Sequence, residues 1–263
     1  MQRTEHWFRQ RRGKLTASNL GQAVGLTPWG SPKALAAQLM LDQHPLPDPD
    51  ELVPEVSAAN ATNAVPEVPD VPAADVSAPV DMPAPKKSKP NPALAWGTNK
   101  EPHGVLEYVS ATGRHVEVTG FWTHPDLDWM GGSPDGLIGS DGILEIKCPY
   151  SRRVYAEVPP YYYLQVNALM EITGREWADL FVWTPDAIKC WRIRRNALAF
   201  GHLCNYYANF FGSVGAGVKP PNPSKELLPL VREWIEADAT LLELPGPVML
   251  EGPDVVRQRR DTG

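Results

Sequence analysis

The sequence predicts an α/β fold, in which a mixed central sheet is flanked by helices. Three observations indicate this fold. Helix and strand patterns alternate after residue 92, short turns join neighbouring strand patterns, and a proline-rich stretch separates them from a helical N-terminal segment. The 263 residues are 43% hydrophobic and include nine Trp, which is enough apolar surface for a sizeable core.

The N-terminal residues carry no apolar run that could serve as a signal peptide. No later stretch approaches the ~18 uninterrupted apolar residues that a membrane span needs. We therefore expect a cytoplasmic protein without membrane contact. Cys148, Cys190 and Cys204 are far apart and form no CxxC pair, so the sequence indicates neither a zinc site nor an iron–sulfur cluster.

The charge is distributed unevenly along the chain. The net charge is −6, but nine acidic residues and no Lys or Arg fall within residues 42–85. The remainder has 25 basic and 22 acidic residues, a balance of +3. Its basic clusters could face phosphate, or could equally be solvated helix ends. They are Arg9, Arg11, Arg12 and Lys14; Arg152 and Arg153; and Arg192, Arg194 and Arg195.

Residues 42–92 hold twelve of the 28 prolines and show neither helical nor strand periodicity. We interpret them as a disordered, acidic Pro/Ala-rich insertion, because such a segment cannot bury enough apolar surface to offset its ordering entropy. The folded parts are then an N-terminal helical part, 1–41, and a core, 93–245, followed by a flexible tail, 246–263. Lengthening a loop of this kind costs only ~0.6 kcal/mol per doubling.

The elements are predicted as follows. Before the insertion, Thr16–Ser18 caps a short helix, and Ser31-Pro32 opens a second helix that runs through Leu39. These helices form a cap on the main fold. After the insertion, the patterns predict a helix over 96–109 that ends near Gly113, followed by strands over 116–122, 129–138 and 143–147. A helix from Pro160 to Gly174 and strands over 177–183 and 188–193 come next. The last two predicted elements are a helix over 198–211 and an amphipathic helix over 225–242.

Two carboxylates and a lysine are brought together around the turn at 139–142. Asp135 precedes this turn, and Glu145 and Lys147 follow it on one strand. Residues two apart on a strand share a face, about 6.6 Å apart along the chain, so Glu145 and Lys147 point the same way while Ile146 enters the core. The hairpin places Asp135 beside them.

This residue set suits hydrolysis of a phosphodiester. Mg²⁺ takes one or two carboxylates together with water and substrate phosphate, and it acidifies a bound water. A neighbouring lysine can orient the nucleophile or stabilise the transition state. Taken singly, Ser-Pro-Asp-Gly is a common turn and Glu-x-Lys a common exposed ion pair. Together, and flanked by apolar Ile143, Leu144 and Ile146, they indicate a metal-dependent site.

The pattern Ser-Pro-Asp135 followed by Glu145-Ile-Lys147-Cys-Pro resembles the PD-(D/E)XK nuclease signature, in the form found in lambda-type exonucleases and YqaJ-like viral recombinases. The resemblance covers nearly the whole chain outside the insertion. Further similar motifs are Trp7-x3-Arg11-x-Gly-x2-Thr-Ala-Ser18, Trp96-Gly-x3-Glu101 and Tyr163-Leu-Gln165-Val. The implied fold is a restriction-endonuclease-like core with an N-terminal helical cap.

The resemblance also implies roles for these residues. The catalytic residues would be Glu101, Asp135, Glu145, Lys147 and Gln165. The metal, Mg²⁺ or Mn²⁺ in its place, would be held by Glu101, Asp135, Glu145 and Ile146. Arg11 and Ser18 would bind a 5′-terminal phosphate, although Arg9 or Arg12 could take the place of Arg11. Some relatives have a second arginine after the Thr-Ala-Ser motif, where this chain has Leu26–Gly30 without one, and Lys33 is a possible substitute.

The function implied by the family is a 5′→3′ exonuclease on double-stranded DNA, active in phage-type recombination. The family further implies a ring-shaped trimer and a single-strand annealing protein as partner. The enzymatic alternatives are a PD-(D/E)XK endonuclease or a RecB-like nuclease. An alternative of another class is a catalytically silent DNA-binding module, although such modules commonly lose one of the residues found here at 135, 145 and 147.

Overall fold

The computed structural model describes residues 4–43 and 91–245, which belong to one compact unit. The insertion predicted for 42–92 lies outside the described residues except at its two ends. Asp42 and Gln43 close helix α3 (Pro32–Gln43), and Asn91 caps helix α4 (Pro92–Thr112) by accepting a hydrogen bond from the Ala93 backbone. The tail predicted for 246–263 also lies outside the described residues.

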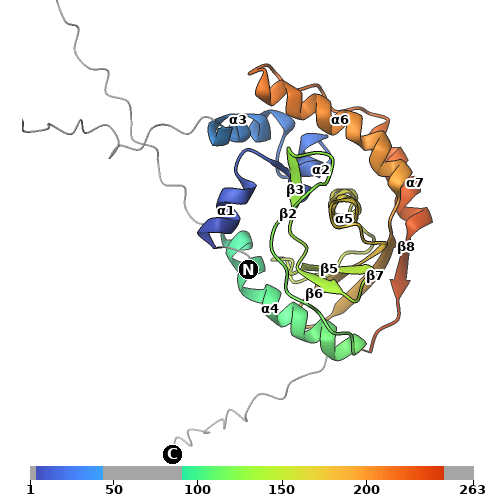
Figure 1. Ribbon diagram of the computed structural model, residues 1–263. Coiled ribbons are helices and arrows are strands. Elements are labelled where there is room, and N and C mark those ends of the chain that lie inside the picture. Colours follow the sequence, from blue (N-terminus) through green and yellow to red (C-terminus); the bar gives the residue numbers. More distant parts are fainter. Residues whose placement is uncertain (1–3, 44–90, 246–263) are drawn as a thin grey trace, which may run out of the picture. The chain divides into compact units, whose positions relative to one another are not determined.

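A five-stranded mixed sheet forms the centre of this unit, as the sequence predicts (Figure 1). Its strands lie in the order β4, β5, β6, β7, β8. Only β5 and β6 pair in parallel, and the other neighbours are antiparallel. The bounds are β4 (Gly136–Ile138), β5 (Gly142–Lys147), β6 (Trp177–Trp183), β7 (Ile188–Arg194) and β8 (Ala239–Leu242).

Helices cover both faces of this sheet. Helix α4 lies against one face, where Tyr108 packs with Leu144, Ile146 and Phe181. The approach is close because residue 104 is glycine: an added Cβ there would lie 2.6 Å from Ile146 Cγ2. Helix α5 (Pro160–Thr173) covers the opposite face, and nine of its 14 residues are buried. Figure 1 shows α4 and α5 on either side of β5 and β6.

The N-terminal segment joins the core through a second, three-stranded sheet. Strand β1 (Leu15–Thr16) pairs in parallel with β3 (Met130–Gly132), which pairs antiparallel with β2 (Trp122–Thr123). The remaining elements are α1 (Glu5–Arg11), a 3₁₀ turn at Ala17–Asn19, α2 (Leu20–Ala23), α6 (Ala197–Gly215) and α7 (Leu227–Asp238). None of the helices in the described ranges is long and apolar enough to cross a bilayer.

Two strand predictions were wrong. The strand predicted over 129–138 is broken at Ser133–Asp135 into β3 and β4, which belong to different sheets. Pro134 has no N–H to donate to a ladder, and this favours a break at that point. The strand predicted over 116–122 is irregular apart from one bridge, Glu117 to Leu137, and the start of β2.

The helix predicted over 225–242 was also wrong at its end. Helix α7 ends at Asp238, and Ala239–Leu242 turns into β8, because the outer edge of β7 offers unpaired backbone groups to any strand that can reach it. Helix α1 was not predicted at all. The helices predicted from Pro32, from Pro160 to Gly174 and over 198–211 are confirmed, as is the end of the helix predicted over 96–109 near Gly113, which adopts a left-handed conformation after α4.

Candidate active site

Strand β5 presents Glu145 and Lys147 to helix α5, where they meet Gln165. Lys147 Nζ donates to Glu145 Oε1 at 2.6 Å and to Gln165 Oε1 at 3.2 Å. Gln165 Nε2 donates to the same Glu145 oxygen at 2.6 Å. The three side chains therefore form a closed triangle of hydrogen bonds. Ile146 points the other way into the core and is 5% exposed, as the alternation of the strand predicts.

Asp135 lies beside this triangle because it directly precedes β4, which pairs antiparallel with β5 through the turn at 139–142. Its backbone N–H donates to the Leu144 carbonyl at 3.0 Å. Its Oδ2 accepts a hydrogen bond of 2.7 Å from the Ile146 backbone N–H. One carboxylate oxygen of Asp135 is thus fixed by the strand that carries Glu145, and the hairpin brings the two acids together as the sequence predicts.

The site concentrates negative charge. Burial raises the pKa of Asp135 well above its ordinary value, and the charges of Glu145 and Glu101 raise it further. Burial would lower the pKa of Lys147, but Glu145, Tyr162 and Asp135 together outweigh that effect, so the net shift is upward and Lys147 stays charged. The single ammonium group of Lys147 is thus set against the carboxyl groups of Glu145, Asp135 and Glu101, a balance that favours a further cation.

Glu101 approaches the site from α4, on the other side of β5. It lines a cavity of about 450 Å³ together with Ile146 and Lys147. The charge of Glu101 contributes to the raised pKa of Asp135, which indicates that the two carboxyl groups are near each other. The structure therefore brings together, around one cavity and the end of β5, all five residues proposed as catalytic.

The chemistry of these groups fits a hard divalent cation. Glu145 is 3% exposed, and its Oε2 is a buried oxygen that has no hydrogen-bond partner in the described part of the chain. A buried, unpaired carboxylate oxygen is costly unless a cation or water meets it. Within residues 4–43 and 91–245, no group of three or more His, Cys, Asp or Glu side chains is arranged so that it could hold a metal ion. Ile146 could contribute only its backbone carbonyl.

Two tyrosines that were assigned no role from the sequence belong to the site. Lys147 Nζ lies 4.5 Å from the ring centroid of Tyr162, and Tyr155 Oη lies 3.4 Å from Tyr162 Oη. Both rings line the same cavity as Glu101. The sequence contains a signal for Tyr162, which lies three residues before Gln165 in the predicted helix, because a helix places residues three apart on one side.

A second cavity, of about 350 Å³, gathers basic residues of the N-terminal segment. Arg11, Arg12 and Lys14 line it. The Arg11 guanidinium lies 4.2 Å from the ring centroid of Trp7, and burial lowers the pKa of Arg11. Arg9 instead points to solvent and pairs with Glu5 at 3.7 Å. The structure therefore favours Arg11 and Arg12 over Arg9 as ligands for a phosphate.

Ser18 lies beside this basic cavity without lining it. Its hydroxyl is 3.1 Å from the hydroxyl of Thr16, which does line the cavity. Ser18 is exposed and lies in the 3₁₀ turn, where it makes no capping hydrogen bond. Lys33, considered as a substitute for a missing arginine, is exposed at the start of α3 and is not among the residues that line the cavity.

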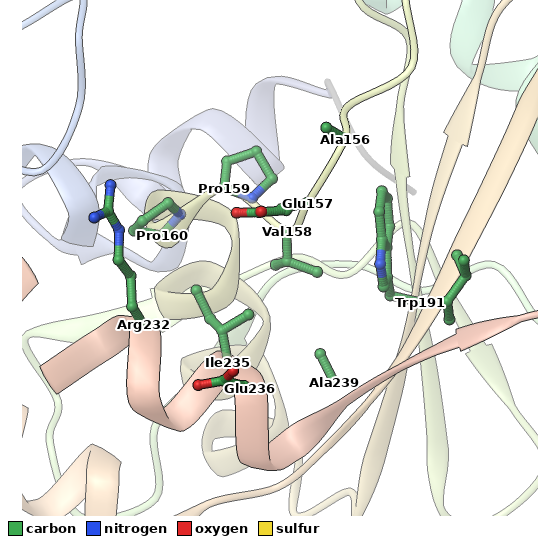
Figure 2. Close-up of a pocket in the computed structure, with 11 residues that line it drawn as sticks. Ala156, Glu157, Val158, Pro159, Pro160, Trp191, Arg232, Ile235, Glu236 and Ala239 are labelled. Atoms are coloured by element: carbon green, nitrogen blue, oxygen red, sulfur yellow. The ribbon is translucent and has the colours of Figure 1, made fainter. Parts of the chain in front are cut away.

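The largest cavity described, of about 620 Å³, lies elsewhere. Figure 2 shows it between the segment 156–160, Trp191 of β7, and Arg232, Ile235 and Glu236 of α7. The residues that line it include two acids, Glu157 and Glu236, but no lysine or amide side chain of the kind found at the end of β5. We therefore place the candidate active site at the smaller cavity, on its chemistry and not on its size.

Comparison with solved structures finds a similar fold in an exonuclease. An alkaline exonuclease (LHK-Exo) from Laribacter hongkongensis matches with a TM-score of 0.58 and 24% identity, covering 89% of this chain and 100% of that one. The same enzyme in complex with dAMP matches equally. A phage-related exonuclease from Haemophilus somnus 129PT is more distant, with a TM-score of 0.44, 11% identity, and coverage of 76% of this chain and 91% of that one. The first two matches confirm the predicted fold class.

The sequence itself gives the family. No curated protein sequence matches the chain. The profile of the YqaJ-like viral recombinase domain, however, matches residues 6–176, which is well over half of the chain and includes every residue proposed as a catalytic, metal or phosphate-binding residue. This match confirms the resemblance and the link to viral-type recombination that the motifs predict. The chain belongs to the YqaJ-like viral recombinase domain family.

Proposed function

We propose that this protein is a magnesium-dependent exonuclease that hydrolyses the phosphodiester bonds of double-stranded DNA in the 5′→3′ direction. The observation that carries the proposal is the cluster of Asp135, Glu145 and Lys147 at the end of β5, with Gln165 bonded to two of them. Its family and its fold, shared with an alkaline exonuclease, support the same activity.

Asp135 and Glu145 would hold the metal, with Glu101 and the Ile146 carbonyl at the same cavity. Magnesium supplies positive charge for the phosphate and lowers the pKa of water. Gln165 fixes one oxygen of Glu145, and the other, which has no hydrogen-bond partner among the described residues, would be available to the cation. Lys147 keeps its proton because Glu145, Tyr162 and Asp135 together raise its pKa against the effect of burial, and a charged donor at this place can stabilise the negative charge that develops on a phosphate oxygen.

The N-terminal basic cavity would hold the end of the strand that is cut. Arg11 presents a partly desolvated guanidinium, fixed by Trp7, and Arg12 and Lys14 add charge beside it. A 5′-terminal phosphate forms charge-assisted hydrogen bonds with such groups. Ser18 would contribute its hydroxyl through the turn that follows β1. Recognition of the end distinguishes an exonuclease from an enzyme that cuts within a strand.

The setting of this activity is phage-type recombination in the cytoplasm of the host. We propose that the protein works as a ring-shaped trimer that encloses DNA and hands the remaining strand to a single-strand annealing protein. Mn²⁺ would replace Mg²⁺, because both accept oxygen ligands in octahedral geometry.

One gel tests the activity. Linear duplex DNA, with or without a 5′ phosphate, is incubated with the protein in Mg²⁺ or in EDTA. We expect degradation of linear duplex in Mg²⁺ only, and faster degradation of the phosphorylated substrate. A covalently closed circle in the same gel separates the rivals. Cleavage of the circle would favour an endonuclease, and binding of DNA without cleavage of any substrate would favour a silent DNA-binding module.

A further inference from the structure

Trp29 is an exposed aromatic side chain in the loop between α2 and α3. It is 62% exposed, although its ring touches Tyr161 at the start of α5. The two ring centroids are 4.6 Å apart and the planes meet at 74°, an edge-to-face arrangement. In this geometry one ring meets the other with its edge, so a face of the indole remains open to solvent.

The loop that carries Trp29 is held in place on both sides. Thr27 Oγ1 donates to the Gly30 carbonyl at 3.3 Å, and Gln22 Nε2 donates to the Ser31 carbonyl at 3.1 Å. Helix α2 also packs tightly on α5, since a Cβ added to Gly21 would lie 2.6 Å from the Cβ of Tyr161. The exposed indole is therefore presented by a fixed scaffold, and little ordering would be needed for it to bind a flat ligand.

A line of rings connects Trp29 to the candidate active site. Tyr161 contacts Tyr162 edge-to-face, with centroids 4.5 Å apart. Tyr162 in turn lies 4.5 Å from Lys147 Nζ and lines the cavity of Glu101. Single exposed aromatics are ordinary on protein surfaces. Trp29 differs from such residues because successive ring contacts through Tyr161 and Tyr162 connect it to Lys147.

We propose that Trp29, supported by Tyr161, is a stacking platform for an unpaired base of the DNA strand being degraded. The inference rests on the proposed nuclease function and adds a contact that neither the metal site nor the basic cavity supplies. Every base offers a flat face, so stacking on an aromatic ring accepts any sequence, as an exonuclease must. The successive contacts from Lys147 through Tyr162 and Tyr161 to Trp29 would let a strand held at Lys147 pass along these rings and place one of its bases on the indole.

Binding in EDTA tests the platform without cleavage. The full-length protein is titrated onto single-stranded oligonucleotides that carry 2-aminopurine at successive positions. In the wild-type protein we expect a change of 2-aminopurine fluorescence at one or two neighbouring positions. Trp29→Ala should abolish that change and weaken binding roughly tenfold. Trp29→Phe should keep most of the affinity. Leu198→Ala, which alters an apolar side chain that is 88% exposed on α6, is the control and should bind normally.

An abasic site identifies the contact as stacking. Removal of the one base that lies on Trp29 should weaken wild-type binding as much as Trp29→Ala does, and should have no further effect on that variant. Equal affinity of Trp29→Ala and wild type, or equal losses from the abasic site in both, would overturn the platform while the nuclease assay still stands. A wild-type protein that bound no DNA would overturn the platform and the proposed function together.

Discussion

The indole nitrogen of Trp7 donates a 2.8 Å hydrogen bond to the hydroxyl of Ser133, which lies 126 residues later in the chain. Trp7 also supports Arg11 of the basic cavity, and Ser133 lies two residues before Asp135. One side chain therefore contacts the parts of the molecule proposed to hold the DNA end and the metal. This contact can be tested directly.

Trp7→Phe keeps an aromatic ring beneath Arg11 but removes the N–H. We expect the free energy of unfolding to fall by about 0.5–1.5 kcal/mol, the net value of one such hydrogen bond, measured by urea denaturation. Ser133→Ala should cost a similar amount. If the hydrogen bond is responsible, the double variant should be hardly less stable than either single one, and strictly additive losses would argue against it.

Lys147→Ala and Glu145→Gln should each remove nuclease activity while leaving the fold and DNA binding largely intact. Loss of ~3 to 4 kcal/mol of transition-state stabilisation corresponds to a rate roughly 10²-fold to 10³-fold lower. Release of nucleotides from linear duplex measures the rate, and circular dichroism checks the fold. Lys225→Ala, which alters an exposed lysine ahead of α7, is the control. A Lys147→Ala protein with more than a tenth of normal activity would exclude the proposed role of Lys147.

The unmodified protein should degrade a 5′-phosphorylated duplex faster than a 5′-hydroxyl duplex, by roughly tenfold, because an arginine–phosphate contact is charge-assisted. Arg11→Ala should abolish the difference under single-turnover conditions without abolishing cleavage. Arg9→Ala is the matched control, since Arg9 is exposed and pairs with Glu5. Lys33→Ala should reduce the preference only if that lysine reaches the DNA end. Equal rates on both substrates for the wild type would move the assignment toward the endonuclease.

Tyr207 and Tyr163 are both fully buried but differ in their hydroxyl groups. Tyr163 Oη donates to Asp238 at 2.6 Å, whereas Tyr207 Oη finds no partner among the residues that the structure describes. Tyr163→Phe should therefore lower the free energy of unfolding by about 1–3 kcal/mol, and Tyr207→Phe should leave it unchanged or raise it. Thermal unfolding of the two variants decides the matter. A Tyr207→Phe loss as large as that of Tyr163→Phe would mean that the hydroxyl of Tyr207 is satisfied.

Replacement of residues 45–90 by a short Gly/Ser linker should leave stability and catalysis nearly unchanged. The composition of this segment predicts no packed core, and a shorter loop has a smaller closure entropy. Hydrogen exchange of the intact protein is the independent measurement. Slowly exchanging amides throughout 55–81 would contradict the interpretation as a disordered insertion.

Much of the main sheet and the candidate site followed from local patterns. Asp135, Glu145 and Lys147 were predicted to meet because a hairpin and a strand face fix their relation within 13 residues. Gln165 joined them only through the family resemblance, since nothing in a lone helical glutamine indicates its partner. The positions of Tyr155 and Tyr162 depend on how α5 rotates against the sheet, which is a property of tertiary packing.

The errors have the same origin. Residues 239–242 suit a helix as well as a strand, and the free edge of β7 decided between them. Residues 129–138 contain a strand pattern, but its two halves pack against different partners. Leu169 leaves no room for a side chain at Gly132, and Val116 leaves none at Gly136. Helix α1 has no buried residue, which explains why the hydrophobic pattern did not reveal it.

The short strand β8 covers the outer edge of β7. It follows α7 without a loop, and Asp238 at the junction accepts hydrogen bonds from both Tyr163 and Asn196. A protease cut ahead of Ala239 would uncover the backbone of Cys190–Ile193, whose unpaired N–H and C=O groups could then recruit a strand of another molecule. Light proteolysis at this junction should therefore produce aggregates before it produces unfolded fragments, and storage conditions for the protein should be chosen accordingly.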